Sequence, residues 1–211
     1  MKYATELIMF DLGGVLIELG NSPIPRGWLP NSENFNLSDW FLSPTALAFE
    51  CGHISAAEFA YSIKTELSLI VDCSEIIDKF TQWPKAFFPD STDILIELRG
   101  KYRLALFSNT NELHWSRFIE EFEIHKYFDH LFASHLLKAA KPDIESFHQV
   151  LDSLKVAPDK VLFFDDNSDN ISSAKRVGIN AVLVSGTGGI RSYLKAKNML
   201  QKTDNYIATG N

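Results

Sequence analysis

The chain has 211 residues, of which 45% are hydrophobic and 12% aromatic, so it can bury one substantial core and a small appended domain. Its net charge of −7 argues against a nucleic-acid partner, because binding a phosphate backbone requires clustered lysine and arginine. Cys51 and Cys73 match neither a zinc site nor a disulfide framework, and no apolar run predicts a signal peptide or a membrane span. We expect a soluble, cytoplasmic protein with no membrane partner.

Short, nearly continuous apolar runs predict buried parallel strands that are covered on both faces. They lie at 7–10, 104–107, 161–164 and 181–184. Amphipathic helices are predicted around the last three runs, at 111–122, 143–156 and 169–178. This alternation predicts an α/β fold with a doubly wound parallel sheet, in which ligands bind at the carboxyl ends of the strands.

The segment after the first strand interrupts this alternation. Residues 20–36 are rich in proline, glycine and asparagine and predict a loop. Three helices are then predicted, at 43–50, 55–67 and 74–83, the second with Ser55 and Glu58 in capping-box spacing and the third with Ser74 as its N-cap. We expect a helical cap over the strand ends; the alternative is a helical layer packed elsewhere on the sheet.

These patterns predict a division of the chain into two domains. Residues 1–17 and 89–200 would form the Rossmann-like α/β core, which a helix at 91–100 re-enters, and residues 18–88 the cap. Residues 201–211 are predicted to be a polar tail. The glycines at 186–189 lack the lysine of a phosphate-binding loop, so we predict a flexible connection there.

Polar residues follow three of the predicted strands at the point where each strand ends. Asp11 follows the first strand, and the other two strands are followed by Ser108, Asn109 and Thr110 and by Asp165 and Asp166. Because the carboxyl ends of parallel strands meet at one edge of a sheet, we expect these side chains to lie together. Their coincidence is the strongest functional signal in the sequence.

This set of residues suits phosphoryl transfer. The aspartates at the strand ends can share Mg²⁺, which prefers hard oxygen ligands and a substrate phosphate. An oxygen of Asp11 can then attack phosphorus, while Ser108 and Asn109 donate hydrogen bonds to the phosphoryl oxygens. Lys141, just before Pro142, is placed to balance the developing charge, and Lys138 is the alternative lysine.

Four stretches carry a family resemblance: "FDLGGVL", "FSNTN", "AKPDIESF" and "FFDDNSDN". They resemble, in order, the motifs of the haloacid dehalogenase-like hydrolase superfamily, and together they look most like its sugar-phosphate phosphatases of the glucose-1-phosphatase type. The resemblance implies a Rossmann-like core with an inserted helical cap. It also implies a Mg²⁺-dependent phosphatase of a small phosphomonoester, such as a sugar phosphate, that works through an aspartyl-phosphate intermediate and takes a phosphorylated metabolite as its partner.

The resemblance also implies the roles of the acidic residues. Asp11 would be the nucleophile and a metal ligand, and Gly13 would offer its backbone carbonyl to the metal. Asp166 would ligate the metal directly. Asp165 would orient Lys141 or reach the metal through water.

On the phosphate side, the resemblance implies that Ser108 and Asn109 bind the phosphoryl group. Lys141 would pair with Asp11 and the phosphate as a catalytic residue. Asn170 would support the acidic loop.

The sequence departs from the family pattern at one important position. Most phosphatases of the superfamily carry an acid two residues after the nucleophile, where this chain has Gly13. The glycine form also occurs in the branch that the chain resembles. A substrate with a good leaving group needs the acid less, and His114 or a cap residue could replace it. Two other functions therefore stay open. One is a metal-independent 2-haloacid dehalogenase, which the pair Asp165 and Asp166 disfavours, and the other is a catalytically weakened binding or regulatory protein.

Overall fold

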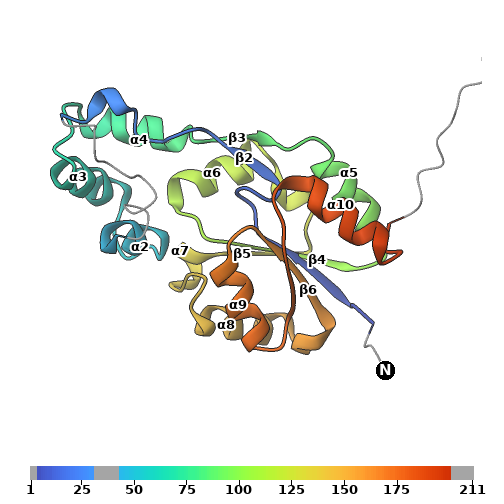
Figure 1. Ribbon diagram of the computed structural model, residues 1–211. Helices are drawn as coiled ribbons and strands as arrows, with labels where there is room; N and C mark the ends of the chain where they lie inside the picture. The colour runs from blue at the N-terminus through green and yellow to red at the C-terminus, as the bar shows by residue number, and fades with distance from the viewer. Residues whose placement is uncertain (1–3, 31–42, 201–211) are drawn as a thin grey trace, which may run out of the picture.

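The structure is a computed structural model that describes residues 4–30 and 43–200 (Figure 1). Its centre is a five-stranded parallel sheet with the strand order β5-β4-β1-β6-β7. The strands are β1 (Leu7–Phe10), β4 (Arg103–Ser108), β5 (His130–Ala133), β6 (Val161–Asp165) and β7 (Asn180–Leu183). The parallel sheet between helical layers confirms the predicted fold class.

Every residue of β1 is buried, and successive side chains of a strand point to opposite faces of the sheet. Helices therefore cover both faces. Ile8 and Phe10 belong to the cluster that is completed by α5 (Ser91–Leu98), α6 (Glu112–Glu120) and α10 (Gly186–Ala196). Leu7 and Met9 face the other layer, which contains α8 (Ile144–Leu154) and α9 (Ser168–Arg176). A short helix, α7 (Ser134–Leu137), follows β5. Short 3-10 turns occupy Arg26–Trp28, Ile124–Lys126 and Pro158–Lys160.

The inserted segment has its own small core. Its helices are α2 (Pro44–Glu50), α3 (Ala56–Glu66) and α4 (Cys73–Thr81), and they share a hydrophobic cluster in which the rings of Phe49, Phe59 and Phe80 are in contact. An antiparallel pair, β2 (Ile17–Leu19) and β3 (Pro84–Phe87), links this segment to the α/β sheet. Figure 1 shows α2 and α3 to one side of the sheet, with α2 next to α7.

The capping box predicted for the second helix of the inserted segment is confirmed. Ser55 and Glu58 form a reciprocal capping box at the start of α3. Gly178 has a φ of +92° just after α9, which is the conformation expected of a glycine that ends a helix.

Two local predictions are wrong. The helix predicted to start at Ser74 starts at Cys73. Ser74 therefore lies inside α4, and Asp72 takes the N-cap position. The glycines at 186–189 form the first turn of α10, because burial of Ile190 and Leu194 against the sheet outweighs the low helix propensity of glycine. The predicted tail at 201–211, and residues 31–36 of the predicted loop, lie outside the described residues.

Within the described residues, no helix combines the length and the apolar character that crossing a membrane requires.

Candidate active site

Asp11 directly follows the last residue of β1 and begins a tight, glycine-containing turn. The backbone N–H of Asp11 still donates to the Phe164 carbonyl of β6 at 2.9 Å, so the residue is fixed by the sheet. Gly14 then adopts a φ of +75°, and a Cβ atom on it would lie only 2.1 Å from an Asp166 carboxylate oxygen. Glycine is therefore required at position 14 both by the backbone conformation and by the close approach of Asp166.

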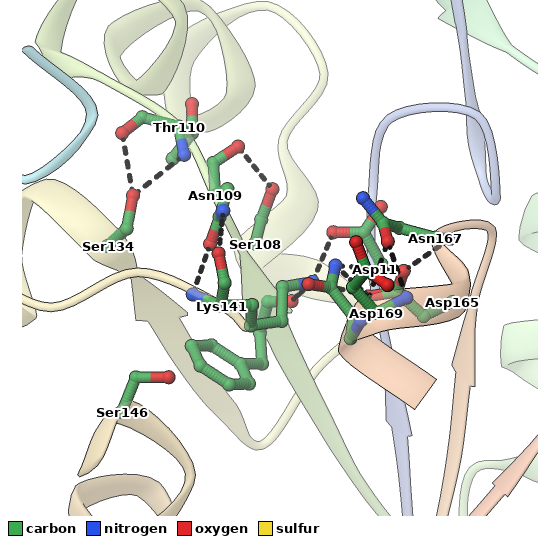
Figure 2. Close-up of polar contacts among 12 residues, drawn as sticks. Asp11, Ser108, Asn109, Thr110, Ser134, Lys141, Ser146, Asp165, Asn167 and Asp169 are labelled. Carbon is green, nitrogen blue, oxygen red and sulfur yellow. Dashed lines mark hydrogen bonds and ion pairs between the residues drawn. The ribbon is translucent and has the colours of Figure 1, made fainter. Parts of the chain in front are cut away.

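Lys141 lies at the centre of the site, and its side chain is only 1% exposed. Its ammonium donates to Asp11 Oδ1 at 2.7 Å, to Asp165 Oδ2 at 2.7 Å and to the Phe107 carbonyl at 2.8 Å (Figure 2). All three donors of the ammonium are thus used. The lysine joins residues that the sequence places 130 and 24 positions away from it.

Two asparagines hold this arrangement in place. The Asn109 amide donates to the Lys141 carbonyl at 2.7 Å and accepts from the Lys141 backbone N–H at 2.9 Å, so it fixes the lysine loop. The Asn170 amide donates to both oxygens of Asp165, at 3.0 and 3.1 Å. The Asn109 side chain, which the sequence assigned to the phosphoryl group, is therefore already bonded to the backbone of Lys141.

The electrostatics of the acids are dominated by burial. Burial raises the pKa of Asp11 to about 7, and the charges of Asp165 and Asp166 also raise it, while Lys141 acts in the opposite direction. Burial and the charge of Asp165 also raise the pKa of Asp166. For Lys141, burial lowers the pKa, but the charges of Asp11 and Asp165 more than offset this and hold it above its usual value.

The remaining strand-end residues come from β4. Ser108 is buried, and its hydroxyl donates a 3.3 Å bond to the Asn109 carbonyl (Figure 2). The Thr110 backbone N–H donates to Ser134 Oγ at 2.9 Å. The Thr110 hydroxyl is buried without a partner among the described residues. No sequence pattern predicts a role for Thr110.

The predicted residues do not all meet here. Lys138, the alternative lysine, donates to the Gly52 carbonyl at 2.6 Å and has no ion pair with Asp11 or Asp165. The structure therefore brings Lys141, and not Lys138, to the carboxylates.

A small cavity of about 70 Å³ lies beside Gly13 and the residues at the end of β4, with room for a few water molecules. It lies between the core and the inserted segment and includes Glu50, a residue that sequence analysis did not single out. Its walls are Gly13, Leu19, Glu50, Phe80, Trp83, Pro84, Ser108, Asn109, Thr110, Asn111, His114 and Phe118.

His114, one candidate for the missing acid, lies in this cavity but is held neutral. Its Nε2 atom lies 2.8 Å from the Phe80 carbonyl and its Nδ1 atom 3.2 Å from the Asn111 amide nitrogen. The neutral tautomer with a proton on Nε2 satisfies both partners. Burial lowers the pKa of His114 to about 4, so it does not carry a proton to be donated at neutral pH.

Replacing His114 with glutamine should therefore change the pH dependence of stability. Because the folded protein binds this proton less readily than the unfolded chain, His114 costs stability as pH falls from 6.5 toward 4. Between pH 8 and pH 5 we expect the unfolding free energy of the wild type to fall by about 2 kcal/mol more than that of His114→Gln. Urea titrations of both proteins at the two pH values measure this difference. Equal falls in both would show that His114 is accessible to protons in the folded state.

The oxygen donors of the site fit a magnesium ion. Asp11, Asp166 and the backbone carbonyl of Gly13 offer hard oxygens. Repulsion from neighbouring acids adds to burial in raising the pKa of Asp11 and of Asp166, and a divalent cation would offset that repulsion. Among the described residues, no group of three His, Cys, Asp or Glu side chains is arranged to hold a metal. Magnesium is commonly bound by only one or two protein carboxylates together with waters and a substrate phosphate.

Comparisons with known proteins identify the family of this chain. Residues 49–184 match the family model described as haloacid dehalogenase-like hydrolase. A sesquiterpene phosphatase of Aspergillus oryzae is 29% identical over 81% of this chain and 85% of its own length. A D-ribitol-5-phosphate phosphatase of Bacteroides thetaiotaomicron is 27% identical over 81% of this chain and 87% of its own length.

A solved structure is also similar to this chain. A haloacid dehalogenase-like family enzyme from Bacteroides thetaiotaomicron, crystallised with magnesium and inorganic phosphate, superimposes with a TM-score of 0.74 at 27% identity. The match covers 85% of this chain and 94% of that enzyme.

Proposed function

The chain belongs to the haloacid dehalogenase-like hydrolases, and from this premise we propose that it is a magnesium-dependent phosphatase that hydrolyses a small phosphomonoester. Asp11 attacks phosphorus, and water then hydrolyses the resulting aspartyl phosphate. The observation that supports this proposal most strongly is the position of Lys141 between Asp11 and Asp165. A buried lysine that pairs with a nucleophile and a second acid provides the positive charge that phosphoryl transfer requires.

We assign the role of nucleophile to Asp11, whose backbone N–H is bonded to β6 and whose carboxylate is bonded to Lys141. Its Oδ1 atom accepts from Lys141, which leaves Oδ2 as the oxygen that attacks phosphorus. Ser108, at the end of the neighbouring strand, donates its hydroxyl to a phosphoryl oxygen. Asn109 contributes by holding Lys141, so its own contact with the phosphate would come from its backbone N–H.

The metal-binding groups are Asp11, the Gly13 carbonyl and Asp166. When bound there, Mg²⁺ neutralises the negative charge of the carboxylates and of the substrate phosphate and aligns that phosphate with Asp11. Asp165 does not need to contact the metal, because Lys141 and Asn170 already bind its oxygens. We therefore assign Asp165 the role of orienting Lys141.

We assign residues 18–88 to a cap that covers the site and limits access to it. The helices of this segment share a hydrophobic cluster of their own, and Glu50, Phe80 and Trp83 reach from it into the cavity. A small phosphorylated metabolite, such as a sugar phosphate, is the substrate that the small size of this cavity and the ribitol-phosphate phosphatase relative support. Both cysteines are free thiols, which supports a location in the reducing cytoplasm.

A dehalogenase that attacks carbon is a weaker proposal for this site. Such a reaction has no use for a metal, whereas Asp166 adds a second carboxylate directly beside the Gly14 turn. The charge of Asp166 raises the pKa of the nucleophile, which is a disadvantage unless a cation is bound.

Release of inorganic phosphate from 4-nitrophenyl phosphate tests the proposed function. We expect turnover with Mg²⁺, loss of turnover in EDTA and full recovery when Mg²⁺ is restored. Asp166→Asn should raise the Mg²⁺ concentration needed for half-maximal rate by at least about 10-fold, because a carboxylate ligand is lost. The matched control is Asp169→Asn, which changes an exposed acid three residues further along the chain, in the first turn of α9.

Two results would contradict the proposal. One is phosphate release that continues undiminished in EDTA. The other is an enzyme that releases halide from a 2-haloacid but no phosphate from any phosphomonoester in a panel of phosphorylated metabolites.

A further inference from the structure

We propose that Glu50, from the inserted segment, is the acid and base of this reaction: it protonates the leaving-group oxygen and then accepts a proton from the attacking water. The inference rests on the proposed phosphatase function and names a catalytic residue for it. An alcohol leaving group needs a proton when its bond to phosphorus breaks, and Gly13 has no side chain that can supply one.

The position of Glu50 suits this role. It is the last residue of α2, it lines the same small cavity as Gly13, Ser108 and Asn109, and the charge of Lys141 acts on its carboxyl group. Its backbone is tied to the core, because Ser134 Oγ donates to the Glu50 carbonyl at 2.6 Å. The same Ser134 oxygen accepts from the Thr110 backbone N–H, so Glu50 and the loop after β4 are held by one hydroxyl.

The carboxyl group of Glu50 is free to act. It is half-buried, and among the described residues it has no hydrogen-bonding partner. Burial raises its pKa to about 7, with the charge of Lys141 opposing this effect. A carboxyl group with such a pKa is present in both protonation states at neutral pH, which suits a group that first gives and then takes a proton.

The other side chains near the cavity do not offer this chemistry. Of the described residues that line it, only Glu50 and His114 titrate between pH 3 and pH 8 in isolation. The two ring nitrogens of His114 are used by Phe80 and Asn111, and its pKa of about 4 leaves it without a proton to donate.

The two half-reactions balance. In the first, the Asp11 oxygen forms a bond to phosphorus, the bond from phosphorus to the alcohol oxygen breaks, and the Glu50 proton passes to that oxygen. In the second, the Glu50 carboxylate takes a proton from water as the water oxygen attacks phosphorus. The bond from Asp11 to phosphorus then breaks, which releases inorganic phosphate, returns Asp11 to its carboxylate form and leaves Glu50 protonated.

A series of substituted phenyl phosphates, from 4-nitrophenyl to 4-methoxyphenyl phosphate, tests this assignment with Glu50→Gln. We expect kcat/KM to fall by about 10²-fold for the poorest leaving group and far less for 4-nitrophenol, which leaves without help from an acid. With 4-nitrophenyl phosphate the variant should also release a rapid burst of nitrophenolate equal to the enzyme concentration. The burst arises because hydrolysis of the aspartyl phosphate has lost its base.

Glu75→Gln, which changes an exposed glutamate in the first turn of α4, is the matched control and should behave as the wild type. Given an active wild type, two results overturn the inference. One is that Glu50→Gln lowers kcat/KM by the same factor on every substrate and shows no burst. The other is that Glu50→Gln leaves kcat/KM unchanged. A wild type that hydrolyses none of the series in Mg²⁺ overturns the proposed function itself. The two failures are therefore distinct.

Discussion

Asp11→Asn is expected to lower phosphatase turnover by a factor on the order of 10⁵–10⁶, the size of loss that follows removal of a nucleophile. The carboxamide keeps the shape of the side chain and can still accept a hydrogen bond from Lys141, so the geometry of the site should persist. It cannot, however, attack phosphorus to give an acyl phosphate. Steady-state phosphate release with saturating Mg²⁺ measures the loss.

The same substitution should not weaken the fold. Because burial and neighbouring acids raise the pKa of Asp11 from 3.8 to about 7, its ionisation costs stability that accumulates as the pH rises from 3.8 to about 7 and is fully present above that range. At pH 8 in EDTA, Asp11→Asn should therefore unfold at the same temperature as the wild type or at a higher one. Asp169→Asn serves as the control, with wild-type turnover. Residual turnover within about 10-fold of the wild type would rule out Asp11 as the nucleophile.

Lys141→Met is expected to be damaging in both activity and stability. Methionine fills a similar volume, but the substitution removes all three hydrogen bonds of the ammonium and leaves two buried carboxylates without their shared cation. Removing one partner of a buried ion pair lowers the free energy of unfolding by about 3–5 kcal/mol. Urea unfolding in EDTA measures this cost, and we expect turnover to fall at least about 10³-fold as well.

A second substitution separates the two effects. Lys141→Met combined with Asp165→Asn removes one of the uncompensated charges, so it should recover part of the lost stability but none of the activity. Lys138→Met, in the same loop, changes a lysine whose ammonium, within residues 4–30 and 43–200, bonds only the Gly52 carbonyl, and it should leave both properties near wild type. If Lys141→Met and Lys138→Met have equal effects, the central position given to Lys141 is wrong.

The sequence predicted the sheet and the edge at which polar residues gather, because its buried strands are uninterrupted apolar runs. Asp11, Ser108 and Asp165 could be identified since each directly follows such a run. The edge strand His130–Ala133 was missed because it is short and partly exposed. The pair β2 and β3 was also missed, since one strand has three residues and the other begins with proline.

Contacts between distant segments cannot be derived from local sequence patterns, and those of Lys141 with Asp11 and Asp165 were expected only from the family resemblance. Nothing local to Lys141 shows that its ammonium bonds two carboxylates, and nothing local to Asn109 shows that its amide holds the lysine loop. Glu50 was missed for the same reason. It ends an ordinary helix, and only the packing of the inserted segment against the core brings it to the cavity.

The most direct test of the account is to locate the phosphoryl group during turnover. The wild type is mixed with excess 4-nitrophenyl phosphate and Mg²⁺, quenched in acid within a single turnover, reduced with borohydride and digested for mass spectrometry. We predict that Asp11 alone is converted to homoserine, the product of a reduced aspartyl phosphate, and that omitting Mg²⁺ prevents it. Reduction at another acid, or full turnover with no trapped phosphoenzyme at any quench time, would contradict the account.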